Sequence, residues 1–245
     1  MFRVVTYNIR AGLGMDGVRS IRRIAEALTL LSPDIACLQE VDQRVPRSWL
    51  SNQPKYLSAR LDMRAVFQRN ISFGVGGYGN CVLVRPSALH CRCHSLPGRG
   101  EPRGVLEVTA QLVLRPDSSG LRRVALDGRG EVTIFCTHLS TDDEVRVEQA
   151  RKAQEIVHAV RGPKLLCGDM NDVRGSQTLA ALLDEPVFRD AALEMDAGDI
   201  PTLSTAVPRR IDFVLADLRF AVKSYQVIES AASDHRPVLV DLELA

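Results

Sequence analysis

The chain has 245 residues and no linker-like stretch, so we expect a single domain over residues 1–245. Its composition, 45% hydrophobic and 25% charged, is typical of a soluble globular protein, and a formal net charge of +1 gives no bulk electrostatic basis for binding nucleic acid. The six cysteines are expected to be reduced, and no apolar signal or membrane-spanning segment is present, so we expect a cytoplasmic protein.

The first half of the chain alternates between patterns typical of strands and of helices. We expect strands over residues 2–9, 35–41, 64–68, 81–84 and 104–114, and helices over residues 20–31 and 49–61. A basic loop is expected between the last two of these strands. The glycine-rich stretch over residues 74–80 would let the backbone approach a ligand closely.

The second half repeats this alternation after a polar hairpin expected over residues 115–130. We expect strands over residues 132–137, 164–167, 210–215, 222–228 and 238–244, and helices over residues 143–160 and 178–183. Asp142 or Asp143 would cap the first of these helices. Strands with helices between them indicate an α/β fold.

Polar and ionisable side chains gather at the ends of the apolar strand patterns. Eight residues share this placement: Asn8, Glu40, His138, Asp169, Asn171, Asp212, Asp234 and His235. In layered α/β proteins ligands bind where strand ends meet, so one site explains these residues better than eight independent accidents. Asp169 and Asn171 are two apart, so in an extended segment they would face the same side.

The chemistry of these residues indicates a metal-dependent hydrolase. Carboxylate and amide oxygens, with two imidazoles and no thiolate, suit a hard divalent cation such as Mg²⁺ or Mn²⁺ rather than zinc. A cation held by carboxylates beside a His/Asp pair is suited to the hydrolysis of a phosphate ester. Because no Ser or Cys lies in a nucleophile-elbow context, direct attack by water is preferred over a covalent enzyme intermediate.

Six short motifs, taken in chain order, resemble those of the endonuclease/exonuclease/phosphatase superfamily, which has the deoxyribonuclease I-like fold. They are Thr6-Tyr7-Asn8, Leu38-Gln39-Glu40, Thr137-His138-Leu139, Gly168-Asp169-Met170-Asn171, Arg210-Ile211-Asp212 and Ser233-Asp234-His235. Each motif alone is weak evidence, whereas the ordered set covers nearly the whole chain. The resemblance implies a four-layered α/β/β/α sandwich, in which two mixed β-sheets pack face to face with helices outside, and divalent-metal-dependent phosphoesterase activity.

The resemblance also implies roles for the matching residues. Glu40 would be the principal metal ligand, with Asn8 and Asp234 nearby. Asp169 would position or deprotonate the attacking water, and Asn171 would hold the phosphate.

The two histidines would complete the catalytic set. His235 would contact the scissile phosphate or move a proton, His138 would be the second imidazole, and Asp212 would orient one of the two. Arg103 resembles an arginine that some members place beside the phosphate. Two further substrate-binding candidates are Tyr78 and Asn80.

Departures from the family pattern indicate which branch of the superfamily the chain resembles. Tyr7 stands where abasic-site nucleases usually carry Trp, and Arg10 stands where they carry an acidic residue. Those nucleases also lack a histidine at the position of His138. The chain therefore resembles more closely the branch of deoxyribonuclease I, sphingomyelinases and inositol-phosphate phosphatases.

Two functions stay open at this point. The first is a phosphodiesterase, with a nuclease as one form of it. The second is a phosphatase or a phospholipase C-like enzyme, acting on a small-molecule or lipid phosphoester. A binding module without turnover is disfavoured because every expected catalytic position carries a competent side chain. The partner would thus be a nucleic acid, a small molecule or a lipid head group, and we expect a monomer.

Overall fold

The structure, a computed structural model, describes residues 1–85, 88–111, 131–183 and 187–244, so the hairpin predicted over residues 115–130 lies outside the described residues. Its strands are β1 (Phe2–Asn8), β2 (Ile35–Gln43), β3 (Arg64–Phe73), β4 (Gly76–Val84), β5 (Ala88–Ser95), β6 (Gly104–Gln111), β7 (Glu131–His138), β8 (Lys164–Asp169), β9 (Phe188–Asp190), β10 (Asp212–Asp217), β11 (Phe220–Val227) and β12 (Val238–Leu244). Its α-helices are α1 (Ile21–Leu31), α2 (Gln53–Leu61), α3 (Asp143–His158), α4 (Gln177–Leu182) and α5 (Ala191–Glu194).

The described strands form two six-stranded sheets. The first has the strand order β11-β12-β1-β2-β4-β3, and the second has the order β5-β6-β7-β8-β10-β9. Each sheet is mixed, because it contains one parallel pair, β1 with β2 or β7 with β8, among antiparallel neighbours. Parallel pairs need a crossover connection, and α1 and α3 supply it.

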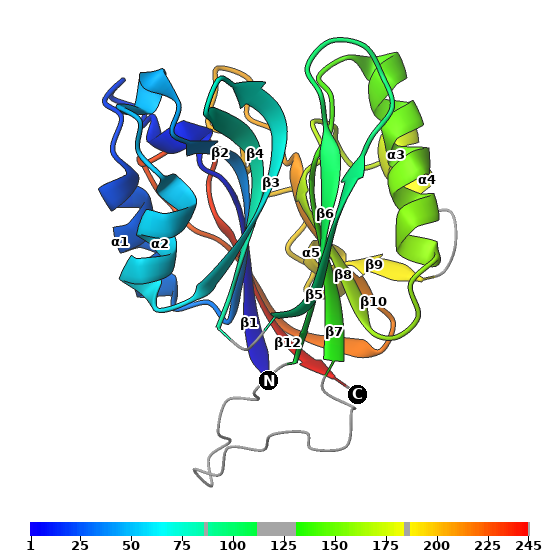
Figure 1. Cartoon of the computed structure of the whole chain (residues 1–245). Helices are drawn as coiled ribbons and strands as arrows, with labels where there is room; N and C mark the ends of the chain where they lie inside the picture. The colour runs from blue at the N-terminus through cyan, green and yellow to red at the C-terminus, as the bar shows by residue number, and fades with distance from the viewer. Residues whose placement is uncertain (86–87, 112–130, 184–186, 245) are drawn as a thin grey trace, which may run out of the picture.

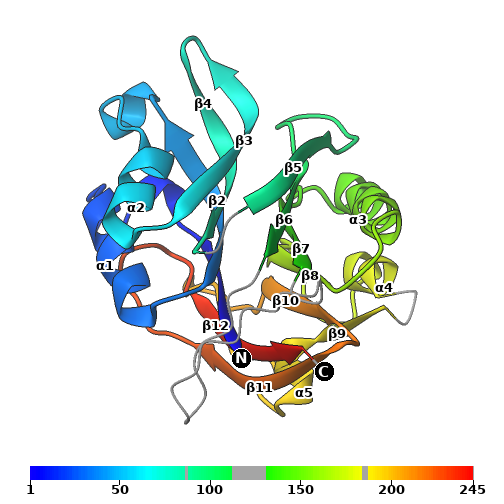
Figure 2. The ribbon, with the colours of Figure 1, turned by 60° about the horizontal axis from the view of Figure 1, so that its bottom comes forward.

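Three apolar clusters hold the layers together. The central one lies between the sheets and includes Val4 of the first sheet and Ile134 of the second. The other two lie under the helices: Leu28 of α1 packs on the outer face of the first sheet, and Ala153 of α3 packs on that of the second. Figures 1 and 2 show the resulting order of helices, sheet, sheet and helices. The predicted four-layered α/β/β/α sandwich is therefore confirmed.

Four of the six cysteines are buried. Cys37, Cys136 and Cys167 belong to the central cluster, and all six cysteines are free thiols. Among the described residues, no helix combines the length and the apolar character that crossing a bilayer requires.

The glycine-rich stretch is mostly strand, which the sequence did not predict. β4 already begins at Gly76, and a Cβ on Gly79 would lie 2.0 Å from the carbonyl oxygen of Gln68 on β3. The glycine therefore permits the close approach of a neighbouring strand, not of a ligand.

Two further predictions about elements are wrong. The basic loop before residue 104 contains a strand, β5, whose His94 Nε2 lies 2.7 Å from Glu107 Oε2 on β6. Charged side chains on β5 and β6 pair with each other across the two strands. Their charges interrupt the alternation of apolar and polar residues by which a strand is recognised in the sequence. The helix predicted from residue 49 begins only at Gln53, because Asn52 caps it and Trp49 has a left-handed φ of 52°.

The register of the strands brings the polar strand ends to one edge of the molecule. Asn8, the last residue of β1, pairs with Gln39, which is next to Glu40 on β2. His138 pairs with Asp169, which in turn pairs with Asp212 at the start of β10. Because β1 starts at the N-terminus, this edge lies opposite the chain ends shown in Figure 1.

A buried ion pair below this edge gives a prediction about stability. The guanidinium of Arg210 binds both carboxylate oxygens of Asp190, and the two side chains are 1% and 3% exposed. Asp190→Ala is expected to lower the free energy of unfolding by about 3–5 kcal/mol, because it leaves the Arg210 charge buried without its main partner. Urea denaturation measures this change.

The matched control is Glu155→Ala, which removes an exposed ion pair with Lys152 on α3. Its expected effect is within about 1 kcal/mol. Equal effects of the two substitutions would contradict the importance given to the buried pair.

Candidate active site

Asp212 and His235 form a buried, hydrogen-bonded pair in the site. The Nδ1 atom of His235 lies 2.8 Å from Asp212 Oδ2, and the Asp212 side chain has no exposed surface. Burial disfavours the charged imidazolium, but the carboxylates of Asp212 and Asp169 outweigh this effect and raise the pKa of His235 to about 10. His235 is therefore a cation at neutral pH, and Asp212 fixes its orientation.

Asp169 lies at the centre of the site. Its Oδ2 atom is 3.4 Å from His138 Nε2 and 3.7 Å from His235 Nε2, and it accepts a hydrogen bond of 2.9 Å from Asn8 Nδ2. Burial, together with the charge of Asp212, raises the pKa of Asp169 to about 6 against the opposing charge of His235. A carboxylate with such a pKa can accept a proton from water near neutral pH.

Glu40 is placed by an irregularity in β2. The pairing of β2 with β4 shifts between Leu38 and Val41, and Glu40 has a left-handed φ of 57°. A non-glycine residue in this conformation costs about 1 kcal/mol or more, a strain that proteins often keep at functional sites. The bulge leaves the carboxylate of Glu40 half-buried, with Oε1 3.1 Å from Asn8 Nδ2. Asn8 thus links Glu40 to Asp169, and hence the first sheet to the second.

Asp234 lies on the Asn8 side of the site. Its neighbour Ser233 donates a hydrogen bond of 2.8 Å from Oγ to the carbonyl oxygen of Asn8. Asp234 Oδ2 is 3.1 Å from Nη1 of Arg10, whose side chain is 43% exposed. A half-exposed arginine can move away when another cation binds the carboxylate.

Asn171 lies beside Asp169, but not for the reason predicted. β8 ends at Asp169, and Asn171 has a left-handed φ of 52°, so the segment is a turn and not extended. The turn is closed by a hydrogen bond of 2.9 Å from the Asn171 backbone N–H to Asp169 Oδ1. The side-chain amide of Asn171 donates to the carbonyl oxygen of Leu139, at 2.8 Å.

Arg103 contacts His138 directly. Its Nη1 atom lies 2.8 Å from His138 Nδ1 and 2.9 Å from Glu101 Oε1. Arginine has no acceptor, so His138 Nδ1 must accept, and the ring proton is then on Nε2, which faces Asp169. Burial and the charges of Arg103 and His235 hold the pKa of His138 well below its usual value. His138 is therefore a neutral imidazole whose protonated Nε2 faces Asp169.

This arrangement predicts the effect of removing the guanidinium. Arg103→Met is expected to release the preference for the Nε2–H form of His138 and to lower kcat by about tenfold, the value of one charged hydrogen bond. The ¹⁵N chemical shifts of the His138 ring report the protonated nitrogen. The control is Glu101→Gln, which keeps the arginine and should keep the Nε2–H form. A proton on Nδ1 in the unchanged protein would contradict this assignment.

Tyr78 and Asn80 lie near the site but have other partners. The Asn80 amide donates to the carbonyl oxygen of Gly104, at 3.0 Å, so it ties β4 to the second sheet. The Tyr78 ring lies under the guanidinium of Arg47, 4.8 Å from its centroid. Burial and the charge of Glu40 raise the pKa of Tyr78. A substrate-binding role for the two residues stays a prediction.

The donor atoms at this edge fit a hard divalent cation. Asp169, Asp212 and His235 each offer a ligand atom, and these atoms lie within 4.8 Å of one another. Asp212 Oδ1 is buried and has no hydrogen-bond partner within the described parts of the chain. The imidazolium of His235 already supplies positive charge to this group.

Two hydroxyl residues that position the site were not singled out from the sequence. Ser233 Oγ connects the segment before β12 to Asn8, and Thr202 Oγ1 accepts hydrogen bonds of 3.1 Å from the backbone N–H groups of Ile211 and Asp212. Ser233 directly precedes Asp234 and His235, so its position in that motif could have identified it as a site residue. Thr202 lies in a loop, and no local pattern distinguishes it.

Comparisons with known proteins concern the fold and the family of the chain. No curated protein matches the chain. Among solved structures, an endonuclease/exonuclease/phosphatase from Beutenbergia cavernae superposes with a TM-score of 0.81 at 27% identity, over 99% of this chain and 71% of that one. A mannosyl-6-phosphatase from Bacteroides thetaiotaomicron gives a TM-score of 0.75 at 20% identity, over 100% of both chains.

The human Nocturnin catalytic domain, solved with a bound sulfate anion, gives a TM-score of 0.73 at 19% identity, over 100% of this chain and 93% of that one. These last two likenesses concern the fold alone. The sequence pattern of the Endonuclease/Exonuclease/phosphatase family matches residues 5–235. The chain therefore belongs to the endonuclease/exonuclease/phosphatase family, whose members are hydrolytic phosphoesterases.

Proposed function

We propose that this protein is a phosphodiesterase that depends on Mg²⁺ or Mn²⁺ and hydrolyses its substrate by direct attack of water. The observation that carries the proposal is the position of Asp169. Its carboxylate lies between the Nε2 atoms of two histidines, at 3.4 and 3.7 Å, and is tied through Asn8 to Glu40. A proton acceptor, two nitrogen donors and a cation-binding carboxylate thus surround one small volume.

Asp169 accepts the proton of the attacking water in this proposal. Its raised pKa supports the assignment, since a base works best when its pKa is near the working pH. The turn hydrogen bond from the Asn171 backbone N–H to Oδ1 holds the carboxylate in place. Oδ2 remains the atom closest to both imidazoles, and it is the atom that receives the proton.

The two histidines bind the phosphoryl oxygens in different states. His235 is cationic, is oriented by Asp212 and stabilises the negative charge that develops on phosphorus oxygens or on the leaving oxygen. His138 is neutral and donates a hydrogen bond from Nε2. Asn171, beside Asp169, is the third group assigned to the phosphate in this proposal.

Glu40, Asn8 and Asp234 would hold the divalent cation, as members of the family generally use such metals. When bound, the cation would neutralise negative charge on the phosphoryl oxygens and on the leaving oxygen. The three residues come from β1, β2 and the segment before β12. Ser233 keeps the segment with Asp234 against Asn8.

The stereochemical course tests this mechanism. A chiral phosphorothioate diester, hydrolysed in ¹⁸O-labelled water with Mg²⁺ or Mn²⁺, is expected to give inversion at phosphorus, because a single displacement by water inverts the centre. Retention would indicate two displacements and a covalent intermediate, and would contradict direct attack.

A second candidate function is hydrolysis of a small-molecule or lipid phosphoester. The feature that favours it is a cavity beside Arg103 with mostly acidic walls, because carboxylates repel the phosphates of a nucleic-acid strand. Parallel assays on plasmid DNA and on bis-p-nitrophenyl phosphate separate the candidates. Cleavage of the small diester without cleavage of plasmid supports a small substrate, and efficient nicking of plasmid supports a nuclease.

A further inference from the structure

The backbone next to the site makes a left-handed turn just after Asn8. Arg10, Ala11 and Gly12 have φ values of 45°, 49° and 78°. This conformation is unfavourable for the two residues that carry a Cβ, and it normally occurs at single residues rather than in a run. Such strain persists only where the surroundings enforce it, and proteins often keep it at functional sites. The turn therefore points to a role in the site.

Contacts from three segments enforce the turn. The backbone N–H of Arg10 donates to Asn8 Oδ1, at 3.1 Å. Nη1 of Arg19 donates to the carbonyl oxygens of Arg10 and Ala11, at 3.0 and 2.9 Å. The buried side-chain amide of Gln53 donates to the carbonyl oxygen of Ala11, at 2.9 Å. The position of Arg10 is thus fixed through its backbone and is coupled to Asn8.

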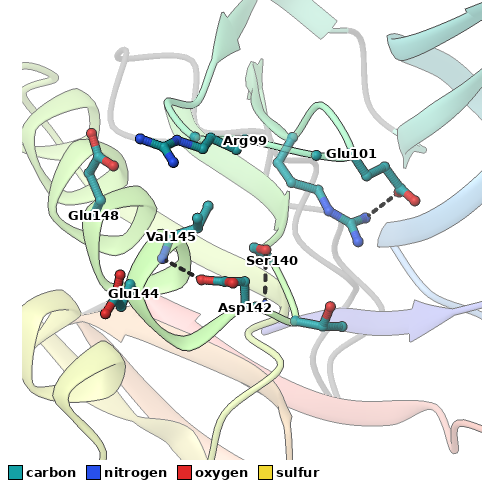
Figure 3. A pocket seen from close by; sticks show the side chains of 11 residues that line it. Arg99, Glu101, Ser140, Asp142, Glu144, Val145 and Glu148 are labelled. Atoms are coloured by element: carbon teal, nitrogen blue, oxygen red, sulfur yellow. Dashed lines mark hydrogen bonds and ion pairs between the residues drawn. The ribbon is translucent and has the colours of Figure 1, made fainter.

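The side chain of Arg10 pairs with Asp234. Nη1 lies 3.1 Å from Asp234 Oδ2, the two side chains are 43% and 20% exposed, and no other carboxylate of the described residues pairs with Arg10. The other arginine at the site, Arg103, is held more firmly. It is 8% exposed and contacts both His138 and Glu101, and Figure 3 shows its ion pair with Glu101. Arg10 is therefore the arginine that can leave its partner easily.

The pairing has a consequence for the cation, because Asp234 is also one of its proposed ligands. A divalent cation approaches carboxylate oxygens to about 2.0–2.2 Å and repels a guanidinium that lies on the same carboxylate. The cation and Arg10 thus exclude each other at Asp234. Binding of the cation must include the displacement of Arg10, and this lowers the apparent affinity.

We propose that Arg10 is a built-in competitor of the divalent cation at Asp234. Arg10 holds the carboxylate in the metal-free protein and releases it when Mg²⁺ or Mn²⁺ binds, so that it sets the cation concentration at which the site fills. The inference rests on the proposed function, because it concerns the cation of that same site. It assigns to Arg10 the control of metal occupancy by a residue that is not itself a ligand.

Titration calorimetry of the metal-free protein with Mg²⁺ and with Mn²⁺, at fixed ionic strength, tests the proposal without a substrate. Arg10→Met removes the charge and keeps much of the side-chain length. It is expected to bind either cation at least about threefold more tightly than the unchanged protein, because Asp234 is no longer paired. Arg10→Lys keeps a cation beside Asp234 and should stay within about twofold of the unchanged protein.

Arg22→Met is the matched control, because it removes the same charge from an exposed ion pair with Glu26 on α1. Its affinity should equal that of the unchanged protein, so that a general effect of net charge is separated from the effect at Asp234. An unchanged or weaker affinity in Arg10→Met, or an equal gain in Arg10→Lys or in Arg22→Met, would overturn the proposal.

A second measurement uses the unchanged protein. The Nε–H resonance of Arg10 in ¹⁵N NMR spectra is expected to move as Mg²⁺ saturates the site, because the ion pair opens, and a resonance that stays in place would also overturn the proposal. If the unchanged protein bound neither cation, the proposed metal-dependent function would fail together with this inference. Binding that Arg10→Met leaves unaltered would reject the inference alone.

Discussion

His235→Ala is expected to lower kcat by at least about 10³-fold, because it removes a positioned cation from the reacting phosphate. His235 is held by Asp212 at 2.8 Å and faces Asp169 at 3.7 Å. Alanine removes both the positive charge and the Nε2–H donor. Steady-state hydrolysis of bis-p-nitrophenyl phosphate at saturating Mg²⁺ measures the loss.

The control for this substitution is His90→Ala, on the exposed surface of β5 outside the site. Its kcat should stay within about twofold of the unchanged protein. Because His235→Ala leaves the Asp212 carboxylate buried without its imidazole, circular dichroism and a thermal melt must accompany the kinetics. A folded His235→Ala protein with a nearly unchanged rate would reject the assignment.

Glu40→Gln is expected to weaken Mg²⁺ or Mn²⁺ binding by at least about tenfold while the fold is kept. Glutamine has the same length and keeps an oxygen toward the cation, but it lacks the negative charge that a hard cation requires. The left-handed conformation at φ 57° is equally accessible to both residues, so the bulge should persist. Metal titration followed by activity and by calorimetry gives the dissociation constant.

Glu26→Gln is the matched control, since Glu26 is exposed on α1 and pairs only with Arg22 in the described structure. It should leave the metal affinity unchanged. If Glu40→Gln also left the affinity unchanged, Glu40 would not be the main ligand. The carboxylates of Asp169 and Asp212 would then be the next candidates.

The fold class could be predicted because its signals are local. Apolar runs such as residues 35–41 and 164–167 coincide with β2 and β8, and the helical spacing over residues 20–31 coincides with α1. The residues at the strand ends were also recognisable, because a charge at the end of a buried strand is costly unless it is used. The structure brings Asn8, Glu40 and Asp169 into direct contact through hydrogen bonds.

Other features depend on contacts between distant segments, which no local pattern encodes. The sequence left open which histidine Asp212 orients, and the pairing with His235 joins β10 to the segment before β12. The contact of Arg103 with His138 joins the start of β6 to the end of β7. The bulge at Glu40 and the left-handed turn at Asn171 are backbone adjustments to tertiary packing. The two-residue spacing of Asp169 and Asn171 therefore predicted an extended segment where the structure has a turn.

The central claim is hydrolysis of a phosphodiester with a divalent cation, and one assay tests it most directly. The purified protein is incubated with bis-p-nitrophenyl phosphate and, separately, with p-nitrophenyl phosphate, each with Mg²⁺ or Mn²⁺ and each with a chelator. The account predicts cleavage of the diester that requires the cation, with little cleavage of the monoester. Cleavage of the monoester alone, or diester cleavage that persists in the chelator, would contradict it.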